Sequence, residues 1–434
     1  MTTDRLHLPA AARTWLLYAL FFVAGVAQAA IVPLLPRLSA RFALSATETA
    51  LLLALPGLAT LVVSVPAGLA ADRFGARRVT LLAGALLCLS SLAQATPSLA
   101  ALLAGRVAFG IAYGIVWTTG MAWLTDLDTT PGGSALGSSV TCSSVGIMAG
   151  PAVGGMLAQV AGLAAPFVTL AGIAAVVVVP LAVGVPDGRT RPARGAQPST
   201  PSISTHRLLG LVRHPGVGAA TGALIVSGAV SGVSQLLISG GLHRLGVSSG
   251  QTGLAFSAAA VCYIAVSATV VRLGRRVHTL RFNALATALL AVALLPALSG
   301  GGAATLFAAL LLTAAPRAAV STIAYSLAKR PAGSAASGDG GEQAGDGEVE
   351  RADGLVFGLL NGAWAAAMVL MPLVAGALEQ RGGARAGYLA VIIPSCAVAA
   401  WLAARSGSGD GGKDGTDGRR QRFRLRPREL GSAG

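Results

Sequence analysis

Charged residues are scarce in this chain. Only 11% of its 434 residues are Asp, Glu, Lys or Arg, whereas 54% are hydrophobic, and the mean hydropathy is +0.70. A soluble globular chain has about a quarter of its residues charged, and a soluble fold of this composition could not cover its surface. Long apolar runs separated by short charged segments instead predict a polytopic membrane protein.

Patterns for metals, disulfides and nucleotides are also missing. The four cysteines, Cys88, Cys142, Cys262 and Cys396, all lie inside apolar segments, and no pair has disulfide-framework or metal-site spacing. We interpret them as small packing residues. No G-x-x-x-x-G-K-[ST] segment occurs, so the sequence indicates no use of ATP. We expect no metal, no cofactor and no enzymatic activity.

The net charge of +15 is high enough for a nucleic-acid-binding protein, but its distribution is not that of one. Lys and Arg lie between apolar runs and near the C-terminal end, where they orient a chain in a lipid bilayer. We therefore expect no nucleic-acid partner. The segment 13–30 is similar to a cleaved secretion signal, but the apolar run continues through 31–35, which favours an uncleaved first helix.

Twelve apolar runs are long enough to cross the roughly 30 Å hydrocarbon core of a bilayer. Backbone polar groups in lipid must be satisfied within each segment, so we predict an all-α membrane protein. The predicted helices are residues 14–36, 46–71, 79–96, 99–125, 136–161, 164–185, 216–240, 250–271, 280–299, 303–328, 354–378 and 385–405.

Lys and Arg are distributed unequally between the two sets of connections. The termini and the connections after even-numbered helices carry 25, whereas the connections after odd-numbered helices carry 5. Basic residues are retained on the cytoplasmic side, so this split predicts cytoplasmic termini. We expect a multi-pass, monomeric protein of the plasma (inner) membrane.

Polar segments divide the chain into two six-helix halves, 1–185 and 216–405. Residues 186–215 are rich in Pro, Ser and Arg, which predicts a cytoplasmic linker. Residues 406–434 are Gly- and Asp-rich and then basic, which predicts a disordered cytoplasmic tail that either anchors the orientation or binds anionic lipid.

The two halves share short segments at matching positions. RFG (73–75) after the second helix matches RLG (272–274) after the eighth, and AMVLMPLVAG (367–376) is a fainter match to GIMAGPAVGG (146–155). These matches favour a parallel internal repeat, a layout found in one large class of transporters.

Three segments in the first half resemble signatures of the major facilitator superfamily. GLAADRFGARRVT resembles its loop 2–3 signature at Gly68, Asp72, Arg73, Gly75 and Arg77, and departs from it at Ala70 and Ala76. LLAGRVAFGIAYG resembles its helix 4 motif at Leu102, Arg106 and Gly110, with Phe109 replacing a Gln. GIMAGPAVGG matches the G-x-x-x-G-P-x-x-G-G pattern of the antiporters at Gly146, Gly150, Pro151, Gly154 and Gly155.

With VPLLP (32–36) at the end of the first helix, these segments make the chain similar to the twelve-helix drug:proton antiporter group. The resemblance implies two six-helix bundles and export of small amphipathic compounds in exchange for protons. It implies that Asp72 lies near the N-terminus of helix 11 and Arg77 pairs with Asp126, contacts that break in the inward-facing state. The helix 5 glycines would press on helix 8 and seal one side of the cavity.

Ionisable residues at membrane depth are candidates for function. None of the 17 acidic residues lies at the centre of a predicted helix, and Arg106 and Arg317 are the two cations inside helices. These arginines predict a preference for neutral or anionic amphiphiles over lipophilic monocations. The candidate cavity residues are Gln28, Trp117, Gln235, Tyr263, Arg317, Asn361 and Trp364.

Two alternatives stay open from the sequence. One is an uptake symporter or facilitator of a small metabolite on the same fold, which the helix 5 pattern disfavours. The other is a non-transporting membrane sensor or enzyme, for which the sequence offers no nucleophile–base pair and no fused catalytic domain.

Overall fold

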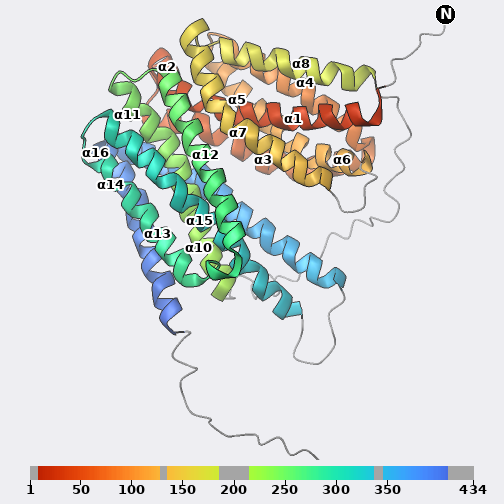
Figure 1. Ribbon diagram of the computed structural model, residues 1–434. Coiled ribbons are helices and arrows are strands. Elements are labelled where there is room, and N and C mark those ends of the chain that lie inside the picture. Colours follow the sequence, from red (N-terminus) through yellow and green to blue (C-terminus); the bar gives the residue numbers. More distant parts are fainter. Residues whose placement is uncertain (1–7, 128–133, 185–214, 337–345, 409–434) are drawn as a thin grey trace, which may run out of the picture.

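The computed structural model describes residues 8–127, 134–184, 215–336 and 346–408, and over these ranges every regular element is helical (Figure 1). Eleven helices in these ranges are long and apolar enough to cross a membrane. The linker predicted at 186–215 and the tail predicted at 406–434 lie almost entirely outside the described residues.

The first half of the chain forms six long helices and several short ones. The elements are α1 (Ala10–Ala30), η1 (Val32–Leu34), α2 (Leu35–Phe42), α3 (Ala46–Phe74), α4 (Ala76–Ala95), α5 (Leu99–Ile115), the π-helical η2 (Val116–Gly120), α6 (Met121–Leu127), α7 (Ser134–Ala161) and α8 (Ala165–Val183).

The second half begins as the first half does, with a long helix, two short elements and a second long helix. The elements are α10 (Pro215–Val233), the π-helical η3 (Ser234–Ile238), α11 (Ser239–Arg244), α12 (Ser249–Leu273), η4 (Gly274–Arg276), α13 (Leu280–Ala293), α14 (Leu295–Leu298), α15 (Ala303–Ala336) and α16 (Asp346–Ser408).

Helices α3 and α12 begin with the same local structure. Ser45 caps α3 in a capping box with Glu48, and Ser248 caps α12 in a capping box with Gln251. In each box the serine hydroxyl and the residue three positions later satisfy backbone N–H groups that a helix start leaves unpaired. Glycines with positive φ end both helices, since glycine has no Cβ to oppose that conformation.

Helix α16 differs from the predicted pair of helices at 354–378 and 385–405. It is continuous in secondary structure except at Gly383, where φ is 73° and ψ is 177°. A Cβ on Gly387 would lie 3.1 Å from the Ala375 carbonyl oxygen, although these residues would be about 18 Å apart along a straight helix. The chain therefore folds back at Gly383, and the predicted connection is reduced to a single glycine.

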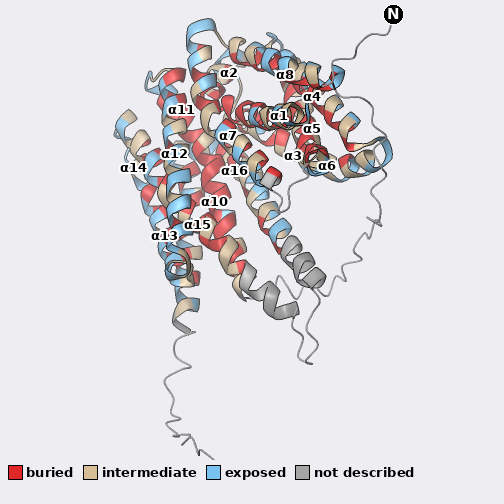
Figure 2. Cartoon of the chain, turned by 45° about the vertical axis from the view of Figure 1, so that its right-hand side comes forward, coloured by how far each residue is buried: buried red, intermediate tan, exposed pale blue. Residues whose placement is uncertain are grey.

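Figure 2 shows exposed residues, in pale blue, along the outer helices, and large apolar residues are among the exposed ones. Val62 and Val160, for example, are 76% and 87% exposed. A protein in water rarely tolerates wide exposed apolar surface, but lipid tails accept it. Inside, small polar residues bridge neighbouring helices: the Thr80 and Thr119 hydroxyls are 2.7 Å apart, and those of Ser227 and Ser321 are 2.9 Å apart.

The most extensive contacts between helices of the two halves are those of α7 with α12 and of α3 with α16. Both contacts include the starts of the capped helices, because Gly155 faces Ser249 on α12 and Gly376 faces Ala46 on α3. We call this region, marked by Ala46, Gly155, Ser249 and Gly376, the closed end of the molecule.

Candidate substrate cavity and the closed end

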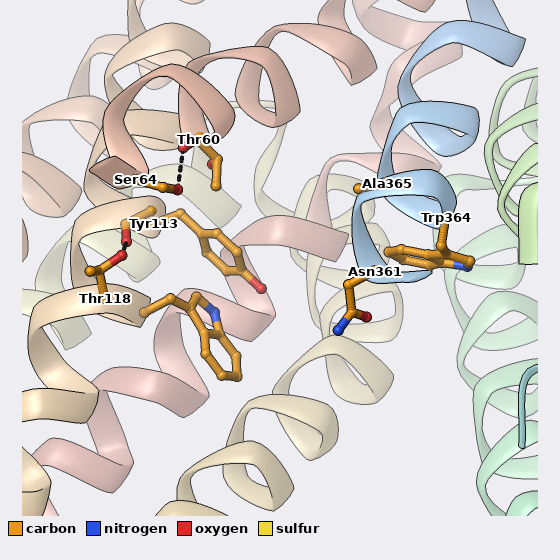
Figure 3. A pocket seen from close by; sticks show the side chains of 9 residues that line it. Thr60, Ser64, Tyr113, Thr118, Asn361, Trp364 and Ala365 are labelled. Atoms are coloured by element: carbon orange, nitrogen blue, oxygen red, sulfur yellow. Dashed lines mark hydrogen bonds between the residues drawn. The ribbon is translucent and has the colours of Figure 1, made fainter. Parts of the chain in front are cut away.

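A cavity of about 360 Å³ lies between α3, α5 with η2, and α16 (Figure 3). No lining residue is charged; they are Thr60, Ser64, Tyr113, Gly114, Trp117, Thr118, Asn361, Trp364 and Ala365. Three of the predicted cavity residues, Trp117, Asn361 and Trp364, are therefore in the lining. The two halves of the chain both contribute to it.

The hydroxyl groups of the lining donate to helix backbone. Thr60 Oγ1 donates to the Gly110 carbonyl (2.8 Å), Ser64 Oγ to the Thr60 carbonyl (2.6 Å), and Thr118 Oγ1 to the Gly114 carbonyl (2.9 Å). Aromatic rings supply much of the remaining surface. Figure 3 shows Tyr113 on one wall and Trp364 on the opposite wall, and the centre of the Trp117 ring lies 6.2 Å from that of Tyr113. The cavity therefore suits an uncharged, largely apolar molecule.

Asn361 is held by a residue that the sequence analysis missed. The hydroxyl of Tyr325 on α15 donates to Asn361 Oδ1 on α16 over 2.6 Å. Tyr325 lies near the end of a predicted helix, and no motif distinguishes it from any other aromatic residue there. Only the packing of α15 on α16 brings the two side chains together.

Arg317 does not line this cavity, nor do Gln28, Gln235 and Tyr263. Arg317 Nη1 donates to Ser231 Oγ over 2.6 Å, and its guanidinium lies 5.1 Å from the centre of the Tyr263 ring. These contacts join α15 to α10 and α12 within the second half of the chain. The ring face partly offsets the desolvation of the cation.

Arg106 also lies away from the cavity, contrary to the prediction of a cationic cavity. Its side chain is 1% exposed, and Nε donates to the Leu52 carbonyl on α3 over 2.9 Å. That carbonyl would normally accept from the N–H of residue 56, but Pro56 has none. Gly110 lies against Pro56 with no room for a Cβ. The helix 4 motif therefore packs α5 onto the proline of α3.

Three glycines of the helix 5 motif face α1 rather than helix 8. A Cβ on Gly146, Gly150 or Gly154 would overlap the backbone of α1; for Gly150 the Val26 carbonyl oxygen would lie 2.7 Å away. These glycines allow α7 and α1 to approach closely, as small residues do in membrane helix pairs. The predicted contact of this face with helix 8 is therefore wrong for these three positions.

Gly155 and Pro151 do contact helix 8, which is α12. A Cβ on Gly155 would overlap the Ser249 carbonyl, and the Pro151 carbonyl meets Gly253. The N–H of Ala152, next to the proline, donates to Ser257 Oγ on α12 over 3.0 Å. Gln159 Oε1 accepts from the Gly250 N–H over 3.1 Å, which satisfies a free donor in the first turn of α12.

The residues of the loop 2–3 motif lie at the other end of α3. Gly75 has φ of 88° and separates α3 from α4, while Asp72 and Arg73 are exposed. Arg77 Nη2 donates to the Ala182 carbonyl at the end of α8 over 3.2 Å, and Gly68 has room beside Thr118.

The two predicted charge contacts of this loop have different outcomes. The side chains of 346–355, at the start of α16, lie outside the described residues, so the contact predicted for Asp72 is not tested. Asp126 is exposed near the end of α6. Its pairing with Arg77 stays a prediction for another conformation.

Comparison with known proteins gives consistent matches. Among solved structures, a bacterial homologue of the human lysosomal transporter Spinster, inward-facing and unoccupied, matches with a TM-score of 0.68 and 15% identity over 92% of this chain and 95% of that one. The nucleoside transporter NupG matches with a TM-score of 0.66 and 11% identity over 91% and 98%. At these identities the likeness shows the fold alone.

Sequence relatives match over shorter stretches. The MFS-type transporter ppzB of Metarhizium majus is 34% identical over 122 residues, and an MFS-type transporter of Schizosaccharomyces pombe is 34% identical over 119. Each match covers 27% of this chain and about a quarter of the relative. The family model described as Major Facilitator Superfamily matches residues 17–340. With the helical fold and the cavity between its halves, this match shows that the chain belongs to the Major Facilitator Superfamily of membrane transporters.

Proposed function

We propose that this transporter exports small, uncharged amphipathic compounds by alternating access, in exchange for protons. The observation that carries the proposal is the cavity without charged side chains between the two halves. The halves meet at the closed end, and the substrate would enter from the opposite end. The helix 5 pattern, with Gly155 and Pro151 against α12, supports antiport.

The proposed topology has twelve spans and a parallel repeat. The fold-back of α16 at Gly383 makes two spans of one continuous element. Gly155 meets the first residue of α12, and Gly376, its partner in the sequence match, meets the first residue of α3. Basic residues favour cytoplasmic termini in the plasma membrane, which makes the closed end extracytoplasmic. We propose a monomer as the functional unit.

The substrate class follows from the cavity rather than from the two arginines. Arg106 and Arg317 are bonded to Leu52 and Ser231 outside the cavity lining. A charged substrate would therefore lose water without gaining an opposite charge from the lining residues. We propose neutral compounds as the preferred substrates. The anionic substrates that the two arginines suggested would find no cation among the lining residues.

The export proposal can be tested in an efflux-deficient bacterial host. Cells that express the chain should resist some neutral aromatic antibiotics and accumulate less of them. Expression should protect the cells little against quaternary ammonium dyes. The matched control is Gly155→Leu, whose side chain would prevent contact with Ser249 and stop the transport cycle. Equal accumulation in cells expressing either form, or no flux in vesicles containing the purified protein, would contradict export and favour a non-transporting sensor.

A facilitator or uptake symporter is the second candidate. The observation that favours a facilitator is the absence of any carboxylate among the residues that line the described cavity, since proton exchange needs a group that binds and releases a proton. Transport in vesicles with and without an imposed pH gradient separates the candidates. An antiporter moves substrate in the direction opposite to proton flow and accumulates it on the more acidic side. A symporter moves substrate together with protons and accumulates it on the more alkaline side. A facilitator only equalises the two substrate concentrations.

A further inference from the structure

The cavity places aromatic rings on both of its opposing walls. Trp117 comes from η2 in the first half, and Trp364, labelled in Figure 3, comes from α16 in the second. Tyr113 lies beside Trp117, with ring centres 6.2 Å apart. Aromatic rings bind other flat rings through their faces and edges. A planar molecule between the walls would contact residues of both halves.

The hydroxyl groups of the lining on α3 and η2 have no donor left for a substrate. The donors of Thr60, Ser64 and Thr118 are used by backbone carbonyls. The amide of Asn361 has an oxygen that accepts and a nitrogen that carries two N–H donors, and the oxygen is directed at the Tyr325 hydroxyl, which donates to it from outside the lining. The amide nitrogen is therefore the polar group of Asn361 that is left for a substrate.

The length of the Tyr325–Asn361 contact identifies which amide atom faces the tyrosine. The two atoms are 2.6 Å apart, which fits O–H···O, for which distances are about 2.5–3.0 Å, and is shorter than usual for N–H···O. Asn361 Oδ1 therefore faces Tyr325. Figure 3 shows the nitrogen of Asn361 on the side of the residue towards Tyr113.

Tyr325 is itself held within the second half of the chain. Its ring lies 5.3 Å from that of Phe357 on α16, at an interplanar angle of 35°. Tyr325 does not line the cavity. Because both partners of the hydrogen bond belong to the same half, the orientation of the amide does not depend on how the two halves are placed.

We infer that Tyr325 is a positioning residue that fixes the Asn361 amide so that the cavity presents an N–H donor to an uncharged, flat aromatic substrate carrying a hydrogen-bond acceptor. This inference rests on the proposed function, because it assigns the substrate to the same cavity. The substrate class is an aromatic ring system with a carbonyl, N-oxide or ring-nitrogen acceptor at its edge. At the Asn361 amide, isosteric rings that offer only a donor are disfavoured, since they would face another donor.

The experiment measures equilibrium binding to the purified full-length protein in lipid nanodiscs, after subtraction of binding to empty nanodiscs. The probes are isoquinoline N-oxide, which only accepts hydrogen bonds, and indole, which only donates; both are uncharged two-ring compounds of similar size. The variants are Tyr325→Phe, Asn361→Asp and Trp117→Ala. The control is Tyr388→Phe, because the hydroxyl of this buried tyrosine has no partner among the described residues.

The wild-type protein should bind the N-oxide more tightly than indole. Tyr325→Phe should weaken N-oxide binding by about two- to tenfold, the usual range for one hydrogen bond, and leave indole unchanged. Asn361→Asp replaces the donor with an acceptor and should reverse the preference. The Tyr388→Phe control should behave as wild type. A role of Tyr325 in stability alone would weaken both probes equally.

Three results would overturn the inference. The first is unchanged N-oxide affinity in a folded Tyr325→Phe protein, the second is an unchanged preference in Asn361→Asp, and the third is no binding of either probe to the wild type. If Trp117→Ala abolishes binding in the first two cases, the cavity remains the binding site and the proposed function stands. Binding that is indifferent to Trp117→Ala would place the probes elsewhere and contradict the proposed site as well.

Discussion

At the scale of single residues, a proline in a membrane helix leaves a backbone carbonyl unpaired, and a side chain from another helix donates to that carbonyl. Pro56 cannot donate to the Leu52 carbonyl, and Arg106 Nε donates to it from α5. In lipid an unpaired carbonyl is costly because no water is available to satisfy it. A residue that a charge count suggests for substrate binding therefore serves the helix backbone.

The Arg106 contact predicts a dependence on Pro56. Arg106→Met should lower stability by about 1–3 kcal/mol, the usual cost of leaving a buried polar group unpaired. Pro56→Ala restores the backbone donor to Leu52, so the loss caused by Arg106→Met should be smaller in that background. Thermal unfolding of the four proteins in detergent measures the coupling. Additive losses in the double variant would show that Arg106 acts elsewhere.

At the scale of helices, two glycines of one motif have different partners. Gly150 faces Val26 and Ala29 within the first half, whereas Gly155 faces Ser249 across the halves. The two positions are five residues apart and so point to different sides of α7. One motif therefore packs α7 within its bundle and also closes the contact between bundles.

Leucine substitutions at Gly150 and Gly155 should impair the protein in different ways. Gly150→Leu overpacks the α1–α7 contact and should cost roughly 1–3 kcal/mol of stability or more, which appears as a lower unfolding temperature. Gly155→Leu should keep the unfolding temperature near wild type and abolish transport, because the closed end cannot form. A Gly150→Leu protein with normal stability and normal export would contradict the assignment of Gly150 to packing.

The contact between α7 and α12 predicts a second, milder perturbation. Gln159→Met removes the acceptor for Gly250 N–H without adding bulk, so the closed end should open about two- to tenfold more often. Labelling of a cysteine introduced at Ala152 with a membrane-impermeant maleimide, in a background without the native cysteines, reports this opening.

Gln94→Met provides the control for Gln159→Met, because the Gln94 amide donates to backbone carbonyls of α4 and α5, both within the first half. Its labelling rate should equal that of wild type. Equal rates in the Gln159→Met and wild-type backgrounds would show that the amide does not stabilise the closed end.

At the scale of the whole molecule, the two pairs of contacts at the closed end suggest how the halves move. Gly57 packs on Val369, but from Thr60 and Asn361 onward the cavity separates α3 from α16. Opening the cavity to the other side requires the closed end to separate and the opposite ends to meet. The loop around Asp72 lies at that opposite end.

Asp72 should therefore matter in the conformation that this structure does not show. Asp72→Asn keeps the size of the side chain and removes the negative charge, which the dipole at the N-terminus of helix 11 would stabilise. We expect the population to shift towards the form with the closed end intact, and labelling of a cysteine at Ala152 to fall. Unchanged labelling would count against Asp72 as a stabiliser of the other conformation.

The amino-acid sequence by itself determined the class of the protein, the positions of the apolar spans and the family. Span length and hydropathy depend on bilayer thickness and local composition, so the predicted runs agree with the described helices to within a few residues, apart from the Gly383 fold-back. The family motifs depend on local spacing in the same way, and the superfamily that they indicated is confirmed by the match over 17–340.

Only the tertiary structure decided which side chains face the cavity. Trp117, Asn361 and Trp364 line it, whereas Arg317 faces Ser231, although all four lie in apolar helices and look equivalent in sequence. Hydropathy is similar all round a buried membrane helix, so no periodicity marks the face that meets a neighbour. Helix packing sets that face, and it joins Tyr325 to Asn361 and Arg106 to Leu52, pairs 36 and 54 residues apart in the chain.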